Sequence, residues 1–195
     1  MDAGGPYEIV EGTSGALTAS GIEPHGGALS YAWDLDMNGT YETFGQTVTI
    51  SVASLEAPAT RTVGVRVTGP TGLTAKDTAT VDVIWNFGGF SGKNEERPSL
   101  NTTKAGANLH LRFTLDGDQG PAVLAAGYPR SGSYTCGGSP LLDATEPASG
   151  DMNLTGNGQY SFAWKTNKDW ADTCRSFVLK LADGTYHYVD VFFDK

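Results

Sequence analysis

The chain has 195 residues, of which 22 are acidic and 13 are Lys or Arg, and its formal net charge is -9. A surface this acidic disfavours nucleic acid and anionic lipid as partners, because both require basic patches that neutralise phosphates. No run approaches about 18 apolar residues, so we expect no insertion into a membrane. Glycine is abundant, with 26 residues, and the recurring threonine and valine favour short strands joined by tight turns.

Strict alternation of apolar and polar residues predicts a hairpin over residues 60–68 and 78–85, joined by a turn rich in glycine and proline. Three shorter strands are predicted earlier in the chain, over residues 16–20, 29–34 and 47–52. The inward-facing positions of the hairpin are expected to be Val63, Val65, Val67, Ala79, Val81 and Val83. Short strands at this spacing indicate a β-sandwich.

Charge is distributed unevenly along the chain. Residues 1–84 hold ten acids against three bases, whereas the remainder is close to balanced. This difference predicts a domain boundary near Ile84. The junction is apolar instead of rich in serine or proline, so a short and stiff connection, and hence a rod, is expected.

The first part carries two distinctive segments, "ALSYAWDLDMNGTYE" and "RTVGVRVTGPTGLTAKDTATVDV". Residues 2–84 with these segments resemble a PKD domain, a module with an immunoglobulin-like fold. The frequent W-D-F-G-D-G of that family is replaced here by the run from Trp33 to Gly39. The resemblance implies a first immunoglobulin-like domain over residues 2–84 and an extracellular context.

The second part is also predicted to be β. Leu109, Leu111, Phe113 and Leu115 alternate with polar residues, and Tyr160, Phe162 and Trp164 share one face of another strand. Residues 175–193 are predicted to form a hairpin around Asp183 and Gly184, with a type I′ turn that requires positive φ at both central residues.

Residues 85–195 resemble the PxKF module of large exported bacterial proteins. The matching pieces are Asn86–Phe90, Lys104–Gly106, "FTLDGDQG", "AAGYP" and "WADTCR". The naming proline-x-lysine-phenylalanine is replaced here by His110–Phe113, which lacks the proline. We therefore expect an all-β chain of two tandem immunoglobulin-like β-sandwiches, over residues 2–84 and 85–195.

The only two cysteines, Cys136 and Cys174, lack the C-x-x-C spacing of zinc or redox motifs. A single disulfide is the simplest interpretation, and two buried thiols are the alternative. A disulfide favours an exported protein over a cytosolic one. We therefore expect a fragment of a longer secreted or cell-surface bacterial protein.

Residues 34–42 begin like a calcium loop, with Asp34, Asp36, Asn38 and Glu42 at the first, third, fifth and ninth positions. The bidentate glutamate expected at the twelfth position is replaced by Gly45. The same residues also suit a turn, because Asp and Asn side chains bond to the backbone two residues on. The turn is the favoured interpretation, a weak extracellular calcium site is the alternative, and no other cofactor is expected.

An exposed tryptophan could stack on a sugar ring. Trp33 and Trp164 are expected in the cores, whereas Trp170, in a polar stretch, is the candidate for stacking on a ligand. The alternative for Trp170 is that it covers the neighbouring disulfide.

The three histidines, His25, His110 and His187, are scattered, and no catalytic sequence motif is present. We expect a protein that is not an enzyme but a structural or adhesive module that spaces, displays or binds. The expected partners are neighbouring domains of a longer chain, surface proteins or glycans. The rival function is a carbohydrate-binding accessory module of an exported hydrolase.

Overall fold

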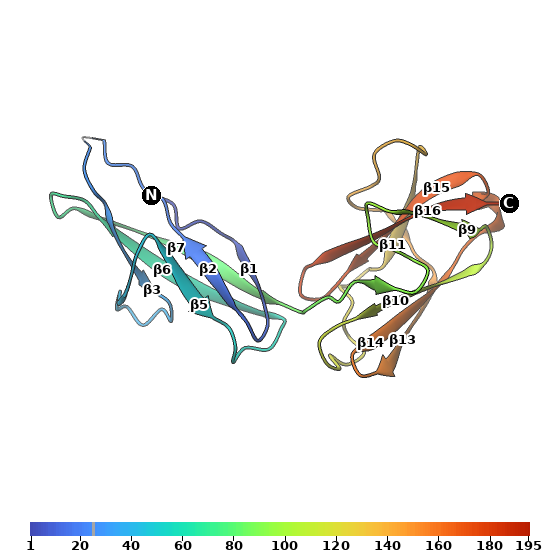
Figure 1. Ribbon diagram of the computed structural model, residues 1–195, viewed down its shortest axis with the longest axis horizontal. Coiled ribbons are helices and arrows are strands. Elements are labelled where there is room, and N and C mark those ends of the chain that lie inside the picture. Colours follow the sequence, from blue (N-terminus) through green and yellow to red (C-terminus); the bar gives the residue numbers. More distant parts are fainter. Residues whose placement is uncertain (25) are drawn as a thin grey trace. The chain divides into compact units, whose positions relative to one another are not determined.

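The computed structural model describes residues 1–24 and 26–195, which divide into two compact units, Met1–Trp85 and Asn86–Lys195. His25, which the sequence places in a turn, lies outside the described residues. Strands account for nearly all of the regular structure, and the described residues contain one helical element, the single 3-10 turn η1 (Lys168–Trp170) (Figure 1). The chain is therefore all-β, as predicted.

The first unit is a sandwich of a five-stranded sheet, in the order β1-β7-β6-β3-β4, and a two-stranded sheet, β2-β5. Its strands are β1 (Tyr7–Val10), β2 (Ser14–Thr18), β3 (Ser30–Asp34), β4 (Thr43–Phe44), β5 (Thr47–Ser51), β6 (Ala59–Thr68) and β7 (Thr74–Ile84). The pair β1 and β7 is parallel, and every other pair in this unit is antiparallel.

The second unit packs a five-stranded sheet, β12-β11-β15-β16-β9, against a four-stranded sheet, β13-β14-β10-β8. Its strands are β8 (Phe90–Ser91), β9 (Leu100–Lys104), β10 (Asn108–Thr114), β11 (Arg130–Tyr134), β12 (Glu146–Pro147), β13 (Gly150–Gly156), β14 (Gln159–Lys165), β15 (Thr173–Lys180) and β16 (Tyr186–Asp194).

The two units share one topology. In the first unit the last strand, β7, lies between β6 and the parallel strand β1. In the second unit the last strand, β16, likewise lies between β15 and the parallel strand β9. The pair β10 and β14 corresponds to β2 and β5, with β8 and β13 added at the two edges. Two sheets of this order, with long connections between them, form the immunoglobulin-like sandwich. The prediction of two such sandwiches in tandem is confirmed.

The alternating positions predicted to face inward do so. All six inward positions of the hairpin formed by β6 and β7 are buried, and Val63, Val65 and Val81 have no exposed surface. In the second unit the core is more aromatic, with Trp164, Tyr160 and Phe113 at most 1% exposed. Period-two patterning therefore located the core strands correctly, because each half-buried strand must place every second side chain between the sheets.

The hairpin of β15 and β16 forms as predicted, but its turn is of a different type. Gly184 has φ of +95°, whereas Asp183 is not among the residues with positive φ. The N–H of Gly184 donates to the carbonyl of Leu181, and the N–H of Leu181 donates to the carbonyl of Thr185. This is a type I turn closed by a glycine bulge, so the expectation of a type I′ turn is wrong.

Trp85 packs with the first unit. Its side chain is 5% exposed, and its indole N–H donates to the carbonyl of Ala57 at 2.9 Å. The last residue of the first unit is therefore Trp85, one position beyond the sequence-based boundary of residue 84.

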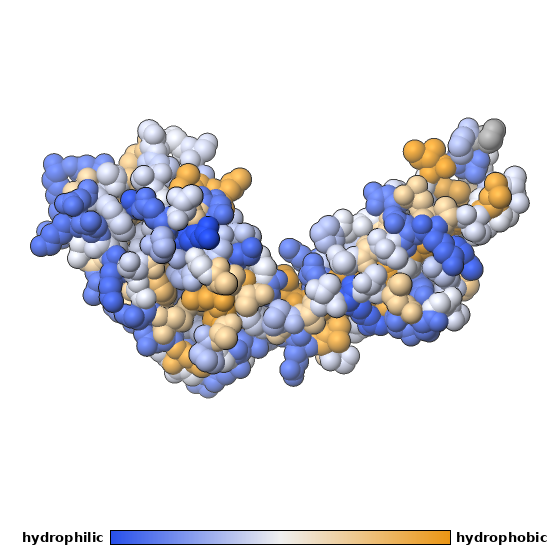
Figure 2. Space-filling view, turned by 180° about the vertical axis from the view of Figure 1, so that it is seen from behind, coloured by the Kyte–Doolittle hydropathy of each residue, from blue (hydrophilic) through white to orange (hydrophobic). Residues whose placement is uncertain are grey.

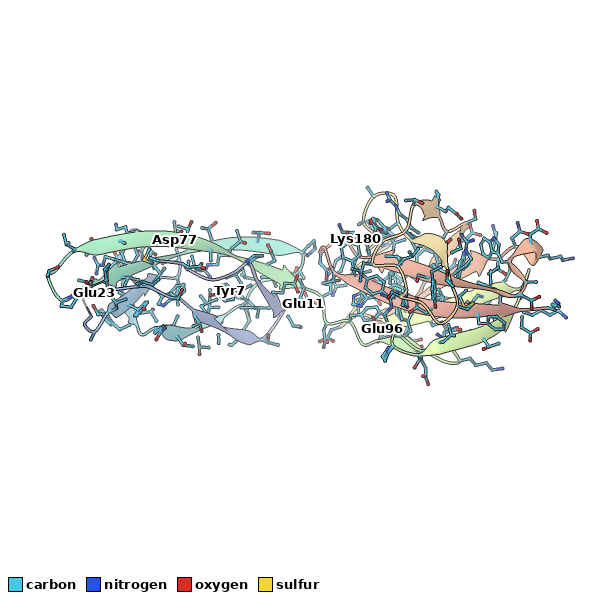
Figure 3. The ribbon with its side chains drawn as sticks, turned by 90° about the horizontal axis from the view of Figure 1, so that it is seen from above. Tyr7, Glu11, Glu23, Asp77, Glu96 and Lys180 are labelled. Atoms are coloured by element: carbon cyan, nitrogen blue, oxygen red, sulfur yellow. A yellow bond between two sulfur atoms is a disulfide. The ribbon has the colours of Figure 1, made fainter. Side chains whose placement is uncertain are left out.

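The amino-terminal residues are fastened to the first sandwich by two side chains (Figure 3). The hydroxyl of Tyr7 lies 2.8 Å from the carbonyl oxygens of Ala3 and Thr18, and it accepts from the N–H of Thr18 at 2.9 Å. The carboxylate of Asp77 accepts the N–H groups of Thr78 and Ala3, which together lower the pKa of Asp77. These contacts link the segment before β1 to both sheets.

On the face seen in Figure 2, apolar side chains are scattered in separate groups among polar ones. The large exposed apolar side chains include Ile22, Phe44, Leu73 and Leu142. No helix in the described residues is both long and apolar enough to cross a membrane.

Candidate functional site

The acidic stretch after β3 forms a turn held by its own side chains. Both carboxylate oxygens of Asp34 accept backbone N–H groups, from Asn38 at 3.1 Å and from Gly39 at 2.8 Å. Asp34 is only 2% exposed, and the side-chain oxygen of Asn38 accepts the N–H of Thr40 at 2.7 Å. The oxygens that would hold a cation thus satisfy the backbone of the turn.

Asp36 and Asn38 of the candidate calcium set lie in the same turn as Asp34, where the N–H of Asn38 donates to both carboxylates. Asp36 bonds to both the backbone and the side chain of Asn38, and Glu42 is exposed. Across the described residues, no group of three or more His, Cys, Asp or Glu side chains is arranged to hold a metal ion. The geometry therefore favours the turn over the ion site.

The four tryptophans differ in environment. Trp33 is fully buried and its indole N–H donates to the carbonyl of Gly45 at 3.0 Å. Trp164 is also fully buried, and its indole nitrogen has no hydrogen-bond partner among the described residues. With Trp85 also buried, only Trp170 has appreciable exposed surface.

Trp170, at the end of η1, is built into the rim of the second core. The guanidinium carbon of Arg175 lies 4.1 Å from the centre of the Trp170 ring. The rings of Trp164 and Phe193 also pack against Trp170, with distances between ring centres of 5.6 and 5.5 Å. Arg175 is 5% exposed and also forms an ion pair with Glu146. One face of the Trp170 ring is therefore already occupied by a cation, which argues against a sugar platform there.

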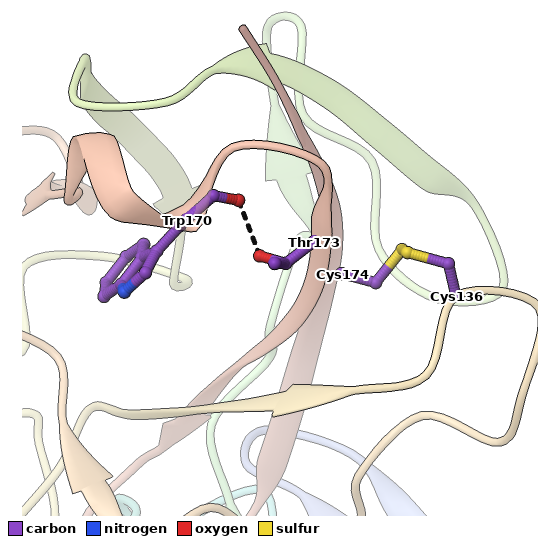
Figure 4. The surroundings of a disulfide bond; sticks show 4 residues. All are labelled: Cys136, Trp170, Thr173 and Cys174. Atoms are coloured by element: carbon purple, nitrogen blue, oxygen red, sulfur yellow. Dashed lines mark hydrogen bonds between the residues drawn. A yellow bond between two sulfur atoms is a disulfide. The ribbon is translucent and has the colours of Figure 1, made fainter.

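Cys136 and Cys174 form a disulfide (Figure 4). Cys174 is fully buried in β15, and Cys136 lies just beyond the end of β11, where the two paired strands separate. The ring of Trp170 points away from the disulfide in Figure 4, while the hydroxyl of Thr173 donates to the backbone carbonyl of Trp170 at 2.6 Å. The interpretation that Trp170 covers the bridge is therefore not supported.

The loop that starts at Cys136 is clamped onto the outer face of the five-stranded sheet by a buried ion pair that the sequence did not reveal. The guanidinium of Arg97 donates to both carboxylate oxygens of Asp190, at 2.7 and 2.9 Å. It also donates to the carbonyl of Leu141 at 2.9 Å, and the hydroxyl of Ser176 bonds to Asp190 at 2.7 Å. Asp190 and Ser176 are 2% and 0% exposed, and the bond from Arg97 to Asp190 raises the pKa of Arg97.

Beside this network, three tyrosines and two cations form a surface on β11, β15, β16 and the segment before β11, called here the tyrosine surface. Its members are Tyr128, Arg130, Lys180, Tyr186 and Tyr188. The rings of Tyr186 and Tyr188 stack with their centres 6.3 Å apart, and the ring of Tyr128 meets that of Tyr186 edge-on with 6.0 Å between the ring centres. The Nζ atom of Lys180, which is labelled in Figure 3, lies 4.5 Å from the centre of the Tyr186 ring. The guanidinium carbon of Arg130 lies 4.7 Å from the centre of the Tyr128 ring.

The loop and the sheet hold these phenols in place. The hydroxyl of Tyr188 donates to the carbonyl of Leu142 at 3.0 Å, and that of Tyr128 donates to Asp143 at 3.0 Å. Tyr186 is 38% exposed and Leu142 is 77% exposed. Tyrosines beside arginine match the composition of protein-binding hot spots.

The phenols of this surface differ in acidity. The ammonium group of Lys180, and then the neighbouring hydroxyl of Tyr128, lower the pKa of Tyr186. The hydrogen bond to Tyr186 raises the pKa of Tyr128, whereas burial raises that of Tyr188. Lys180 is thus the largest cause of the lowered pKa of Tyr186.

The two described histidines, His110 and His187, lie on different sheets. His110 is exposed on β10, whereas His187 lies on β16 in the opposite sheet, with its ring stacked 3.5 Å from that of Phe87. The Nδ1 atom of His187 lies 3.2 Å from a carboxylate oxygen of Glu96. Each described histidine is thus accounted for by local packing or by solvent exposure.

No protein-family model and no curated protein matches the chain. Among solved structures, fibronectin(III)-like modules of Clostridium thermocellum CbhA match at 15% identity, covering 99% of this chain and 90% of that chain, with a TM-score of 0.35. Murine CEACAM1b matches at 11% identity, covering 97% of this chain and 96% of that chain, with a TM-score of 0.35. A chimeric titin Z1Z2-Z1Z2 tandem matches at 11% identity, covering 96% of this chain and 94% of that chain, also with a TM-score of 0.35. Similarity this low carries no functional argument.

Replacing Asp34 tests the turn. We expect Asp34→Ala to lower the free energy of unfolding of the first unit by about 2 kcal/mol, because two N–H groups lose a charged acceptor. The exposed Asp36→Ala is expected to cost less than about 1 kcal/mol. Thermal unfolding of the wild type should show the same midpoint with calcium and with chelator. A midpoint raised by calcium would restore the ion-site interpretation.

Replacing Arg97 tests the clamp. Arg97→Met leaves the buried Asp190 carboxylate without its cation and should destabilise the second unit by about 3 kcal/mol or more. Urea unfolding followed by NMR signals from both units measures this loss, with the first unit as internal control. The double variant Arg97→Met/Asp190→Leu should recover part of the loss. A double variant as unstable as the sum of the two single variants would show that the pair does not act as a unit.

The acidity of Tyr186 should depend on Lys180. Lys180→Met removes the donor that lowers the pKa of Tyr186, so this pKa should rise toward the ordinary value for tyrosine. An NMR titration of the Tyr186 ring signals measures the change, and Lys195→Met serves as control because Lys195 pairs instead with Asp172. An unchanged titration in Lys180→Met would contradict the assigned contact.

Proposed function

We propose that the chain is a non-catalytic interaction and spacing module of a longer secreted or cell-surface bacterial protein, with PKD-like and PxKF-like parts. The tyrosine surface is the observation that carries the interactive role. It gathers three tyrosine rings and two cations, and contacts from the clamped loop hold two of the rings. Such preorganised side chains lose little conformational entropy when a protein partner binds.

The disulfide supports the extracellular part of the proposal. Disulfides persist in oxidising compartments and are rare in reducing ones. The bond between Cys136 and Cys174 joins two segments of the second unit that are 38 residues apart, so it constrains the long loop between β11 and β12. A module that works outside the cell gains resistance to unfolding from this constraint.

The rival function, a carbohydrate-binding accessory module that stacks sugars on Trp170, is not favoured. Arg175 lies over one face of that ring, and Trp164 and Phe193 pack against it. Trp170→Ala would therefore remove core contacts and destabilise the second unit, so loss of glycan retention in this variant alone would not demonstrate stacking.

Site-directed photocrosslinking tests the proposal. A photoreactive phenylalanine at position 186 should capture one protein species in the cells that produce the longer chain. The matched control is the same substitution at Leu154, which is also 38% exposed but lies on β13 in the opposite sheet. Excess wild-type chain should suppress the capture, whereas excess of the double variant Tyr128→Ala/Tyr186→Ala should not.

Two results would contradict the proposal. Equal and non-specific capture at positions 186 and 154 would remove the interactive role of the tyrosine surface. Turnover by the purified chain of any substrate in a panel of polysaccharides, esters and peptides would show that the module is an enzyme.

A further inference from the structure

The outer face of the four-stranded sheet in the second unit is hollowed on both sides of Arg112. One hollow of about 540 Å³ and another of about 350 Å³ share Ser91 and Arg112 as lining residues. The two hollows are called here the basic groove. It lies mainly on β8, β10 and β14, with Thr102 and Thr103 of β9 at one edge, and its lining shares no residue with the tyrosine surface.

The strand register explains why Arg112 stands at the middle of this groove. Arg112 on β10 is directly opposite Ser161 on β14 and Ser91 on β8, so the three side chains form a row across the sheet. Its neighbours Leu111 and Phe113 are buried in the core, and alternation turns Arg112 and His110 outward.

The charge of the groove is opposite to that of the chain. The protein has 22 acidic residues and a net charge of -9, yet neither hollow is lined by an Asp or Glu. Three lining residues, Lys93, His110 and Arg112, can carry positive charge. Asp151, an acid on the same sheet face, is paired with Lys165 at 2.9 Å.

Arg112 has no hydrogen bond or ion pair through its guanidinium to any other described residue. Around it, the groove presents mainly neutral polar groups that can exchange hydrogen bonds, among them Ser91, Thr102, Thr103, Gln159 and Ser161. A planar guanidinium pairs in a bidentate way with carboxylate or sulfate groups, and hydroxyl and amide side chains bond to sugar hydroxyls.

We propose that the basic groove binds an anionic polysaccharide, with Arg112 paired to a carboxylate or sulfate group of the sugar chain. The negative charge of such a polysaccharide complements the positive charge of the groove. Two separated cations, Lys93 and Arg112, suit widely spaced anionic groups, whereas nucleic acid carries a phosphate charge about every 1.7 Å of duplex and would be repelled by the rest of this chain. The two aromatic rings that line the groove, Phe113 and Tyr160, are each 1% exposed, so they offer no surface on which bases could stack.

Affinity electrophoresis tests this proposal. The chain is run in native gels that contain polygalacturonate, dextran sulfate or neutral dextran, at about 0.1 M salt, where charges separated by more than about 10 Å are screened. We expect retardation by polygalacturonate, by dextran sulfate or by both, and none by neutral dextran. The two polyanions distinguish a carboxylate ligand from a sulfate ligand.

Arg112→Gln should weaken the retardation about tenfold in affinity, because one charge-assisted contact is lost. The matched control is Arg61→Gln, which makes the same change in net charge in the first unit. A second groove variant, Lys93→Gln, should weaken binding less than Arg112→Gln. Thermal unfolding of each variant checks that the exposed substitutions leave the fold intact.

Several outcomes would overturn the proposal: no retardation of the wild type in either polyanion, equal retardation by neutral dextran or by single-stranded DNA, or equal effects of Arg112→Gln and Arg61→Gln. The double variant Tyr128→Ala/Tyr186→Ala should migrate like the wild type in these gels. The groove and the tyrosine surface are thus tested separately, and failure of one leaves the other standing.

Discussion

The ion pair between Arg97 and Asp190 is the contact on which the second unit's outer surface depends. A carboxylate that is only 2% exposed must be fully bonded, and Arg97 and Ser176 supply three of its contacts. The same guanidinium holds the backbone of the loop at Leu141. One buried charge therefore fixes the loop to the sheet, and the loop in turn positions Tyr128 and Tyr188.

The strand cores could be predicted because their signal is local. Val63, Val65 and Val67 in the first unit, and Tyr160, Phe162 and Trp164 in the second, carry a period of two that only a half-buried strand explains. The shorter strands β4, β8 and β12 have two residues each, too few to show a period. The parallel strands β1 and β9 were not anticipated either, since their partners lie far away at the ends of the units.

The candidate surfaces could not be predicted, because they join segments that are distant in the chain. Arg97 and Asp190 are 93 residues apart, and nothing in the sequence around Arg97 distinguishes it from an ordinary surface arginine. Trp170 was singled out as exposed because of its polar neighbours, yet Arg175 and Phe193 reach it from two other strands. Arg112 stands in the motif that carried one resemblance, but its lack of an acidic partner is visible only in the fold.

The parallel pairing of β1 with β7 gives the first unit a direction of mechanical strength. The chain enters at the start of β1 and leaves at the end of β7, so tension on the two ends pulls these neighbours past each other along their length. Their interstrand bonds then bear the load together, instead of opening one after another as they would if the strands were peeled apart. The first unit is therefore expected to resist a pull on its two ends more strongly than a pull that peels β1 away from β7.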